Sequence, residues 1–317
     1  MAKKSGDTAA GVESPAGRKS LPKRLLNLAI TGLLVLLLAV GICIMFYPSI
    51  SDYVNETRQT QAISGYKRAV REITVTDYSE IFAAARIYNE NLARSPLPIE
   101  KLLKMGQKDV DRKTEYWGLL NVAGDGMIGY IRIDSLGINL PIYHGMSDRV
   151  LAKSAGHMQG TSLPIGGDST HAIVSGHTGL PSAKLFTGID KLKPGDTFTL
   201  YILNEVLTYQ VDQVIKVLPT EVDELQIFEG DDYVTLMTCT PYGINSHRLF
   251  VRGERTENPP EAIELDEEED IESVEELSWL SRVHKKFMDI LSAIVLTVAT
   301  WLKGVSEWVM ELFGVEY

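Results

Sequence analysis

Three residues of this chain are of types that together could cleave and re-form an amide bond: a cysteine, a histidine and an arginine. Cys239 stands at the end of the alternating stretch Tyr233–Thr238, and Arg248 opens the next alternating stretch after a break at 241–243. The period-two, β-branched pattern predicts neighbouring strands that place both side chains at one rim of a sheet. A thiol is a useful nucleophile only as the thiolate, and a nearby fixed cation favours that form. On its own, a free cysteine is more often a small buried apolar residue.

His177 follows the apolar stretch 172–175 and stands among glycines, so it is predicted just past the end of another strand. Imidazole can act as an acid or a base near neutral pH, but a single histidine in such a place is by default a polar loop residue. His247 is the neighbour of Arg248 in one predicted strand, so these two side chains should face opposite sides. The other histidines have no stronger chemical claim: His144, His157, His171 and His284.

Short strands with turn signals between them follow one another from residue 126 to residue 255, without regular helices in between. This order predicts a mainly β fold, closed or nearly closed into a barrel, and not a parallel α/β sheet. A short helical turn or two is expected in 181–192. The predicted strands are Met127–Ile133, Leu140–Tyr143, Ala172–Ser175, Asp196–Leu203, Leu207–Val217, Tyr233–Thr238 and Leu249–Arg252.

Residues 1–24 form a polar tail that is basic toward its end, and residues 25–47 carry no charge. At about 1.5 Å per residue, this apolar stretch is long enough to cross a bilayer core of about 30 Å as a transmembrane helix. A cleaved signal peptide is the alternative, but the stretch is too long and offers no small-residue cleavage site. The basic residues before it predict a cytoplasmic N-terminus, with the bulk of the chain outside the cell.

Residues 48–125 are predicted to be helical and then irregular. Residues 77–80, Asp-Tyr-Ser-Glu, have the pattern of a capping box, and apolar residues then recur on one helical face. The helix should end at 95–98, Ser-Pro-Leu-Pro, because a residue before proline is restricted to extended conformations. Residues 101–116 show no clear period and are predicted to wrap the domain as a loop.

The charge of the chain is unevenly spread. Its 317 residues carry a formal net charge of -11, and eleven acidic residues with no basic one lie between Glu257 and Glu276. This composition predicts an extended, solvated linker over residues 256–280. Residues 281–317 hold the apolar stretch Phe287–Val305, predicted as a membrane segment that either spans the bilayer or lies in its interface. No basic aromatic surface points to nucleic-acid binding.

The chain has two cysteines, Cys43 in the apolar stretch and Cys239. They cannot pair within one extracellular domain, so Cys239 is predicted to be a free, reactive thiol in an oxidising compartment. No His, Asp or Glu cluster has the spacing of metal ligands, so neither a metal nor a cofactor is predicted, although scattered carboxylates leave calcium open.

Several segments, in the same order along the chain, resemble the catalytic core of the class C, or pilus-assembly, sortases. The most specific is Thr238–Leu249, which reads Thr-Cys-Thr-Pro-Tyr-Gly-Ile-Asn-Ser-His-Arg-Leu. The others are Gly124–Ile133, Leu140–Gly145, Gly156–Pro164 and His171–Ala183. The resemblance covers roughly residues 45–255.

The resemblance implies an eight-stranded sortase β-barrel (126–255) with an N-terminal membrane helix, and a site made of His177, Cys239 and Arg248. Cys239 would attack the Thr–Gly carbonyl of a Leu-Pro-x-Thr-Gly-like sorting signal and form a thioester. His177 would protonate the departing amine, and Arg248 would hold the substrate backbone and stabilise the oxyanion. A lysine amine of the next pilin would then take the acyl group, so the implied partners are pilin subunits.

Two features depart from the family pattern. The family carries a lid with an Asp-Pro-aromatic motif before the barrel, whereas this chain contains no Asp-Pro pair. The candidate lid is 95–116, with Ser95, Pro96 and Leu97 as the nearest analogue of the motif. The site is therefore predicted to be less firmly plugged, or plugged by another residue. Thr178 follows the histidine where many relatives have arginine, which would alter substrate choice and leave the three candidate residues intact.

Three functions remain open at this point. The leading one is a membrane-anchored cysteine transpeptidase of the cell surface that polymerises pilins. The second is a sortase that attaches proteins to a peptidoglycan amine; the C-terminal apolar segment and the class C-like motifs count against it. The third is a non-catalytic, membrane-tethered barrel that binds surface proteins, which the intact set of cysteine, histidine and arginine argues against.

Overall fold

The computed structural model describes residues 23–98, 101, 108–180, 183–221, 223–260 and 262, with single positions between 286 and 304. Its contacts divide the chain into a unit Met1–Met45 and a unit Phe46–Tyr317. The predicted basic tail lies outside the described residues except for its last two positions, and so do nearly all of the predicted linker and C-terminal membrane segment. The second unit holds the elements that position the candidate site.

Helix α1 (Lys23–Arg71) contains the predicted membrane segment 25–47 and continues well beyond it. Large apolar side chains of this stretch are not covered by protein: Leu33, Leu38 and Ile44 are 52%, 65% and 68% exposed. Within the described part of the chain, α1 is the one helix that is long and apolar enough to cross a membrane. A helix that exposes apolar residues in this way suits a lipid environment, so α1 is a candidate membrane anchor.

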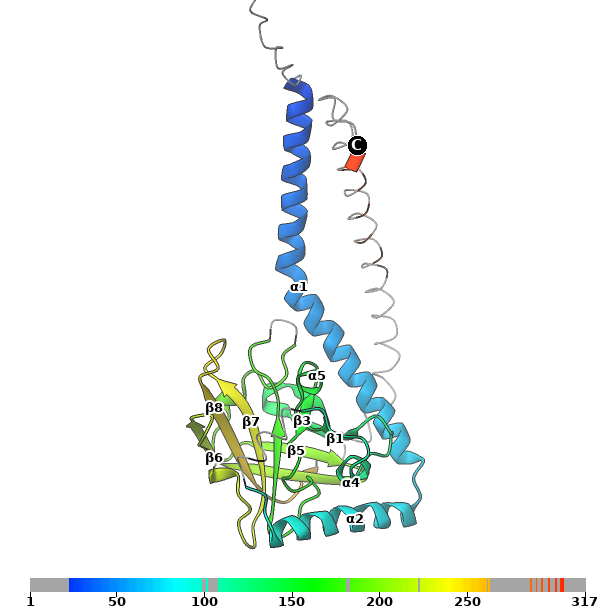
Figure 1. Ribbon diagram of the computed structural model, residues 1–317, viewed down its shortest axis with the longest axis vertical. Helices are drawn as coiled ribbons and strands as arrows, with labels where there is room; N and C mark the ends of the chain where they lie inside the picture. The colour runs from blue at the N-terminus through cyan, green and yellow to red at the C-terminus, as the bar shows by residue number, and fades with distance from the viewer. Residues whose placement is uncertain are drawn as a thin grey trace, which may run out of the picture. The chain divides into compact units, whose positions relative to one another are not determined.

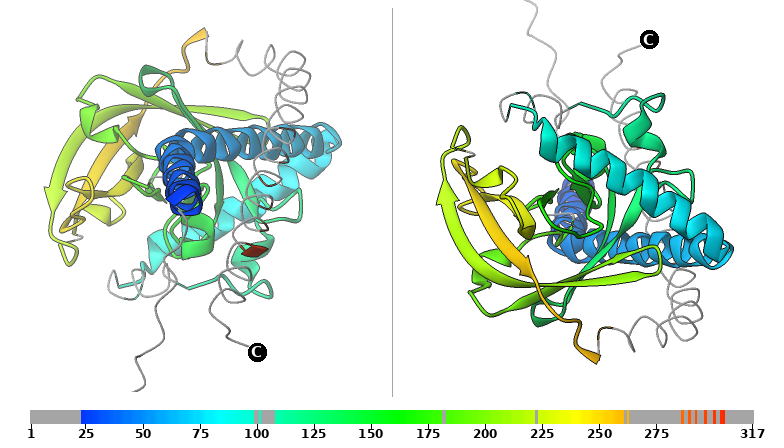
Figure 2. Two further views of the ribbon diagram at one scale, coloured as in Figure 1. Left: turned by 90° about the horizontal axis from the view of Figure 1, so that it is seen from above. Right: turned by 90° about the horizontal axis from the view of Figure 1, so that it is seen from below.

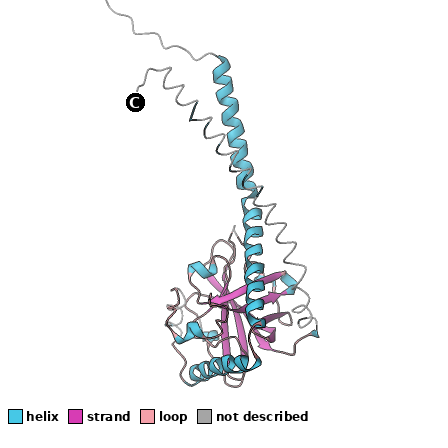
Figure 3. Ribbon diagram, turned by 90° about the vertical axis from the view of Figure 1, so that its right-hand side faces the viewer, coloured by secondary structure: helices cyan, strands magenta, loops and turns pink. Residues whose placement is uncertain are grey.

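Eight strands close into one barrel, which confirms the predicted fold class. Their spatial order is β1-β2-β3-β4-β7-β8-β6-β5, and Figure 1 and Figure 3 show them gathered in one body. The sequence predicted every strand except β3, which is too short to show alternation. The strands are β1 Met127–Ile133, β2 Ile138–His144, β3 Ala155–His157, β4 Thr170–Ser175, β5 Thr197–Ile202, β6 Glu205–Val217, β7 Asp232–Thr240 and β8 His247–Arg255.

The strands around the candidate site are buried on both faces. Side chains of one parity, such as Leu236 in β7 and Val251 in β8, point into the barrel and join its main core. Because successive residues of a strand face opposite sides, Cys239 and Arg248 lie on the other, outer face. A second apolar cluster covers this face and is called the outer cluster below. Its buried members are Met146, Met158, Ile173, Leu225, Met237 and Phe250.

Helix α2 (Val75–Arg94) lies across one end of the barrel, as the side view in Figure 1 and the view from below in Figure 2 show. Asn89 fixes it there, because its amide donates to the Leu163 carbonyl (3.0 Å) and its Oδ1 accepts the Leu163 N–H (2.7 Å). Side chains of α2 and the segment 166–170 line one cavity, so this is the end at which β4 begins. The candidate site lies at the opposite end, where β4 and β7 finish.

Thr74 caps α2 and forms a capping box with Asp77, so the predicted box at 77–80 was wrong by three residues. The end of α2 at Arg94 agrees with the predicted stop at 95–98. The other helical elements whose bounds fall within the described residues are short: α4 (Glu115–Gly118), α5 (Asp148–Leu151), and the 3-10 turns η1 (Asp134–Leu136), η2 (Ile189–Lys191) and η3 (Asp223–Leu225).

Candidate active site

The three candidate residues lie in one row across neighbouring strands. Cys239 and Arg248 are directly opposite each other in the antiparallel pair β7–β8, a position that brings Cβ atoms to about 5 Å. Strand β4 runs parallel to β7, with Ser175 opposite Met237. His177 follows two residues after Ser175 and therefore lies level with Cys239. The structure thus brings together all three residues that the sequence singled out.

The backbone at His177 is fixed on both sides. Gly176 N–H donates to the Met237 carbonyl (3.1 Å), and Thr238 Oγ1 donates to the Gly176 carbonyl (2.7 Å). Phe186 N–H donates to the His177 carbonyl (3.0 Å), which folds the following segment back on itself. A Cβ at Gly176 would come within 2.7 Å of the Phe186 ring, so this close approach requires glycine.

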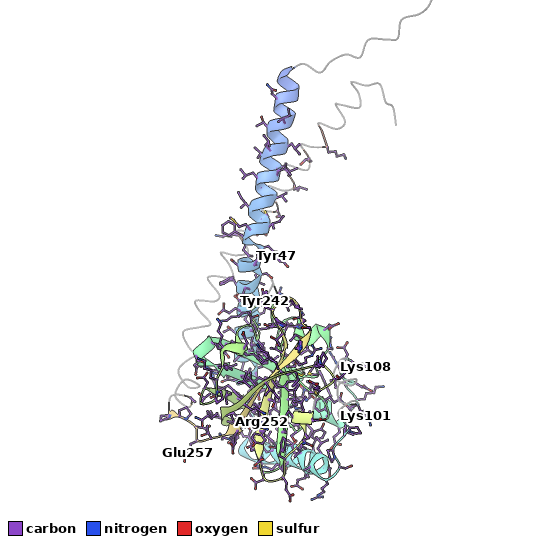
Figure 4. All side chains as sticks on the ribbon, turned by 90° about the vertical axis from the view of Figure 1, so that its left-hand side faces the viewer. Tyr47, Lys101, Lys108, Tyr242, Arg252 and Glu257 are labelled. Atoms are coloured by element: carbon purple, nitrogen blue, oxygen red, sulfur yellow. The ribbon has the colours of Figure 1, made fainter. Side chains whose placement is uncertain are left out.

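An apolar floor adjoins the row. Met237 is paired with Phe250, one step along the strands from the Cys239–Arg248 pair and on the same face. These two side chains are 6% and 2% exposed and belong to the outer cluster. Tyr242, in the loop after β7, is 65% exposed at the end of the barrel (Figure 4).

Two arginines of β8 face the same side but have different surroundings. The Nε of Arg252, also labelled in Figure 4, lies 3.0 Å from Asp212 Oδ2, and its guanidinium lies 4.3 Å from the centre of the Tyr233 ring. Arg248 has no carboxylate partner within the described residues, and its Nη1 makes a 3.4 Å contact with the His247 carbonyl. The Arg248 guanidinium is therefore available for a peptide carbonyl or an oxyanion.

Burial lowers the pKa of His177 below its ordinary value, and the negative charge of Asp148 opposes this shift. Asp148 begins α5, and Leu151 lies on the same face of that helix one turn later. Leu151 packs over Gly156, where an added Cβ would come within 3.2 Å of it, and Gly156 is opposite Ser175 in the sheet. Helix α5 is therefore placed beside the end of β4, immediately before His177.

Within the described residues of the candidate lid, Leu97 packs against the apolar cluster of the outer face. It is partly buried against the outer cluster, whereas Ser95 and Pro96 are exposed. Later in the candidate lid, Asp109 accepts a hydrogen bond from Ser147 Oγ (2.7 Å), just before α5. The described parts of the candidate lid thus contact the outer cluster at one point and the residue before α5 at another.

Two other histidines are buried and structural. Burial lowers the pKa of His157 to about 3; its Nδ1 accepts from the Tyr116 hydroxyl (2.7 Å) and its Nε2 donates to the Ser162 carbonyl (2.8 Å). Burial lowers the pKa of His171 to about 4, and its Nε2 accepts from the Thr235 hydroxyl (2.8 Å). Both rings are neutral and bonded on both nitrogens, so neither is a candidate acid or base.

Sequence reasoning missed Asp148 and Tyr116. Asp148 lies in a four-residue helix, which is too short to show a hydrophobic period. The sequence predicts Tyr116 at the end of a loop. The one signal of a structural role is that an aromatic residue ends an otherwise polar stretch. Among the described residues, no group of three or more His, Cys, Asp or Glu side chains is placed to hold a metal ion, and both cysteines are free.

Comparison with known proteins identifies the family. A family model of the Sortase domain matches residues 131–256. The crystal structure of sortase C1 from Streptococcus agalactiae is 46% identical, with a TM-score of 0.56, and the match covers 63% of this chain and 100% of that chain. Sortase C from Streptococcus pneumoniae is 37% identical, with a TM-score of 0.53, over 62% of this chain and 97% of that chain.

Sortase A of Streptococcus agalactiae serotype III is 34% identical over 117 residues, which are 36% of this chain and 47% of that protein. The chain therefore spans about half the length of this curated relative. The identity and coverage of the solved structures decide the assignment: the chain belongs to the sortase family of cysteine transpeptidases. Its solved neighbours are sortases C, as the resemblance of its segments predicted.

Proposed function

We propose that this sortase polymerises pilins, with Cys239 as nucleophile, His177 as acid and base, and Arg248 as the cation that holds the substrate. The observation that carries the proposal is the row of these three residues beside an apolar floor. A thiol, an imidazole and an unpaired guanidinium at one rim are the groups that acyl transfer through a thioester needs.

In the first half of the reaction, the Cys239 thiolate attacks the Thr carbonyl of a Leu-Pro-x-Thr-Gly-like sorting signal. Arg248 binds the oxygen on which negative charge develops, and its own charge does not titrate away. The Thr–Gly bond then breaks, and His177 gives its proton to the departing glycine nitrogen, because an amine anion cannot leave unaided. A thioester on Cys239 and a neutral His177 remain.

In the second half, a lysine amine of the next pilin attacks the thioester carbon. The C–N bond forms, the C–S bond breaks, and Cys239 leaves as the thiolate. Neutral His177 takes the proton that the attacking nitrogen loses, which restores the starting state. Because the thioester stores the energy of the cleaved amide bond, the enzyme joins subunits outside the cell without ATP.

The pilin substrate is supported by one of the solved structures to which this chain is similar. The solved structure of Streptococcus pneumoniae sortase C is described in terms of catalysis and pilin substrate specificity. The floor of Met237 and Phe250 suits the apolar leucine and proline of a sorting signal. We place α1 in the cell membrane, with the N-terminus in the cytoplasm because of the basic residues before it, and the barrel outside.

The candidate lid supports partial closure of the site. An aliphatic residue, Leu97, packs against the outer cluster in a chain that has no Asp-Pro-aromatic motif. An aliphatic side chain buries less apolar surface than an aromatic one, so closure is weaker and easier for a substrate to displace.

The proposal is tested by incubating the full chain, in detergent micelles, with a Leu-Pro-x-Thr-Gly peptide and measuring the intact mass. An adduct of the acyl fragment is expected on the wild type and not on Cys239→Ala. A lysine-containing peptide should then release the adduct as an amide faster than a glycine-based peptidoglycan mimic does. A wild type that forms no adduct contradicts the proposal, and a preference for the glycine amine points to cell-wall attachment instead.

A further inference from the structure

His177 begins a loop whose two limbs are hydrogen bonded to each other. Phe186 N–H donates to the His177 carbonyl (3.0 Å). Gly179 N–H donates to Thr187 Oγ1 (3.1 Å). A shift of the returning limb, residues 183–187, is therefore transmitted to the backbone of the proposed acid and base.

The returning limb is bonded to helix α1. Lys184 N–H donates to Asp52 Oδ1 (2.7 Å), so a carboxylate of α1 holds the backbone of the limb. On its other side, Lys184 Nζ donates to the Leu136 carbonyl (2.7 Å), in the turn between β1 and β2. Asp52 follows closely on the apolar stretch 25–47, and the second half of α1 runs down to the barrel in Figure 1. The part of α1 next to the candidate membrane segment thus contacts the loop of the candidate active site.

A second contact of α1 reaches the other element that acts on His177. Gln59 Nε2 donates to the Lys153 carbonyl (2.8 Å), just after α5. Lys153 N–H in turn donates to the Val150 carbonyl (3.2 Å), which joins this residue to α5. Helix α5 carries Asp148, whose negative charge acts on His177. Helix α1 therefore holds both the loop that His177 begins and the helix that carries its carboxylate neighbour.

The bond to Asp52 sets the position of the returning limb more than its folding. Leu185 and Phe186 are buried in the main core, so the limb stays folded without this bond. On the α1 side, Lys184 borders a cavity of about 460 Å³ that Asp52 and Gln59 also line. Side chains do not fill the space there, so the limb has room to shift when the bond is lost. A displacement of about 1 Å at a catalytic group is enough to slow a reaction strongly.

We propose that Asp52 and Gln59 are positioning residues for the proton transfers of His177. They lie on one face of α1, since a spacing of seven residues is about two helical turns. Asp52 acts through the loop 177–187, and Gln59 acts through α5 and Asp148. This inference rests on the proposed function, because both residues affect the reaction only through the acid and base that the proposed mechanism assigns.

The role of His177 as an acid depends on the leaving group of the substrate. When the Thr–Gly amide breaks, the electron pair of the C–N bond stays on nitrogen, which must receive a proton from His177. In a thioester substrate, the electron pair of the C–S bond leaves with a thiolate, which is stable without a proton because a thiol has a pKa of about 8.5. A misplaced His177 should therefore slow cleavage of the amide and spare cleavage of the thioester.

The test compares these two substrates on the full chain in detergent micelles. One is a Leu-Pro-x-Thr-Gly peptide, and the other is the same peptide with a thioester in place of the Thr–Gly amide. Formation of the Cys239 adduct is followed by intact mass. Asp52→Ala and Gln59→Ala each remove one hydrogen bond, whereas Asp52→Asn keeps an acceptor oxygen. Glu56→Ala is the matched control, since Glu56 is an exposed carboxylate between these two positions on the same helix.

Asp52→Ala is expected to lower kcat for the amide about tenfold with KM unchanged, which is part of the hundredfold or more that a positioned acid contributes. The rate with the thioester should stay at the wild-type value, which also shows that the variant is folded. Gln59→Ala should lower kcat for the amide about threefold, the low end for a neutral hydrogen bond. Asp52→Asn should keep most of the amide rate, and Glu56→Ala should match the wild type with both substrates.

Two results would overturn the inference and leave the proposed function standing. The first is an Asp52→Ala variant that loses equal rate with the amide and the thioester, because its effect would then be structural. The second is an Asp52→Ala variant that cleaves the amide at the rate of the Glu56→Ala control. If the wild type forms no adduct with either substrate, the proposed function itself fails.

Discussion

The protonation of His177 is set by two opposing influences, burial and the carboxylate of Asp148. Burial disfavours the imidazolium, which the proposed mechanism needs when the glycine amine leaves. Asp148 favours it, and α5 places that carboxylate beside the end of β4. At the scale of single residues, Asp148 therefore acts through His177 and is a positioning residue, without contact to the reacting atoms.

Asp148→Asn is expected to lower the pKa of His177 further, because the one influence that raises it is removed. The acid form of His177 is lost as pH rises through this pKa, so the alkaline limb of kcat/KM for thioester formation should move to lower pH. The measurement is a pH profile of peptide cleavage, with Asp168→Asn as the control, since Asp168 is an exposed carboxylate at the α2 end of the barrel. Coincident alkaline limbs for the two variants would show that Asp148 does not act on the acid.

At the scale of elements, alternation in the sequence located the strands of the site, because β7 and β8 each run long enough to show period two. It also placed Cys239 and Arg248 on one rim, since both follow from the register of one hairpin. The contacts of Leu97 and the position of Asp148 could not be predicted. Both depend on how short segments without periodicity fold back over the barrel, and their local sequence does not carry that information.

The contact of Leu97 with the outer cluster predicts that the lid limits access to the thiol. Leu97→Ser should speed alkylation of Cys239 by a bulky reagent about tenfold, because losing a partly buried leucine weakens closure by about 1.4 kcal/mol. Alkylation rates of the full chain measure this, with Ile87→Ser, an exposed position on α2, as the control. If both variants react at the wild-type rate, Leu97 does not cover the thiol.

Tyr116 joins the end of the candidate lid to β2 and β3. Its hydroxyl donates to His157 Nδ1 and accepts the N–H of Gly145 (3.3 Å), and both partners are buried. Tyr116→Phe leaves them unsatisfied and should lower the free energy of unfolding by about 1–3 kcal/mol. Denaturant unfolding of the full chain in micelles checks this. The exposed Tyr242 offers the matched Tyr242→Phe control, and equal losses in both variants would refute the assignment.

At the scale of the whole molecule, the residues of the proposed reaction and the buried histidines that stabilise the barrel lie in different parts of it. Residues at the end of β4, β7 and β8 carry the proposed reaction, while the buried rings of His157 and His171 sit within the sheet and hold adjoining strands and loops together. These rings remain neutral because burial depresses their pKa values to about 3 and about 4. Enzyme activity and barrel stability should therefore respond to acid through different histidines.

The stability of the barrel should fall as the pH is lowered from about 6.5 to about 4. In this window the unfolded chain binds protons at both histidines, whose ordinary pKa is about 6.5, while the folded barrel does not. The contribution of the two neutral rings to the free energy of unfolding is complete above about pH 6.5 and is on the order of several kcal/mol for both together.

His171→Gln should lower stability at pH 7 and flatten the dependence of stability on pH. His247→Gln, at a partly exposed ring, is the control and should do neither. Unfolding midpoints of the full chain between pH 7 and pH 4 measure both slopes, and a His171→Gln slope equal to that of the wild type would show that the buried ring does not couple folding to acid.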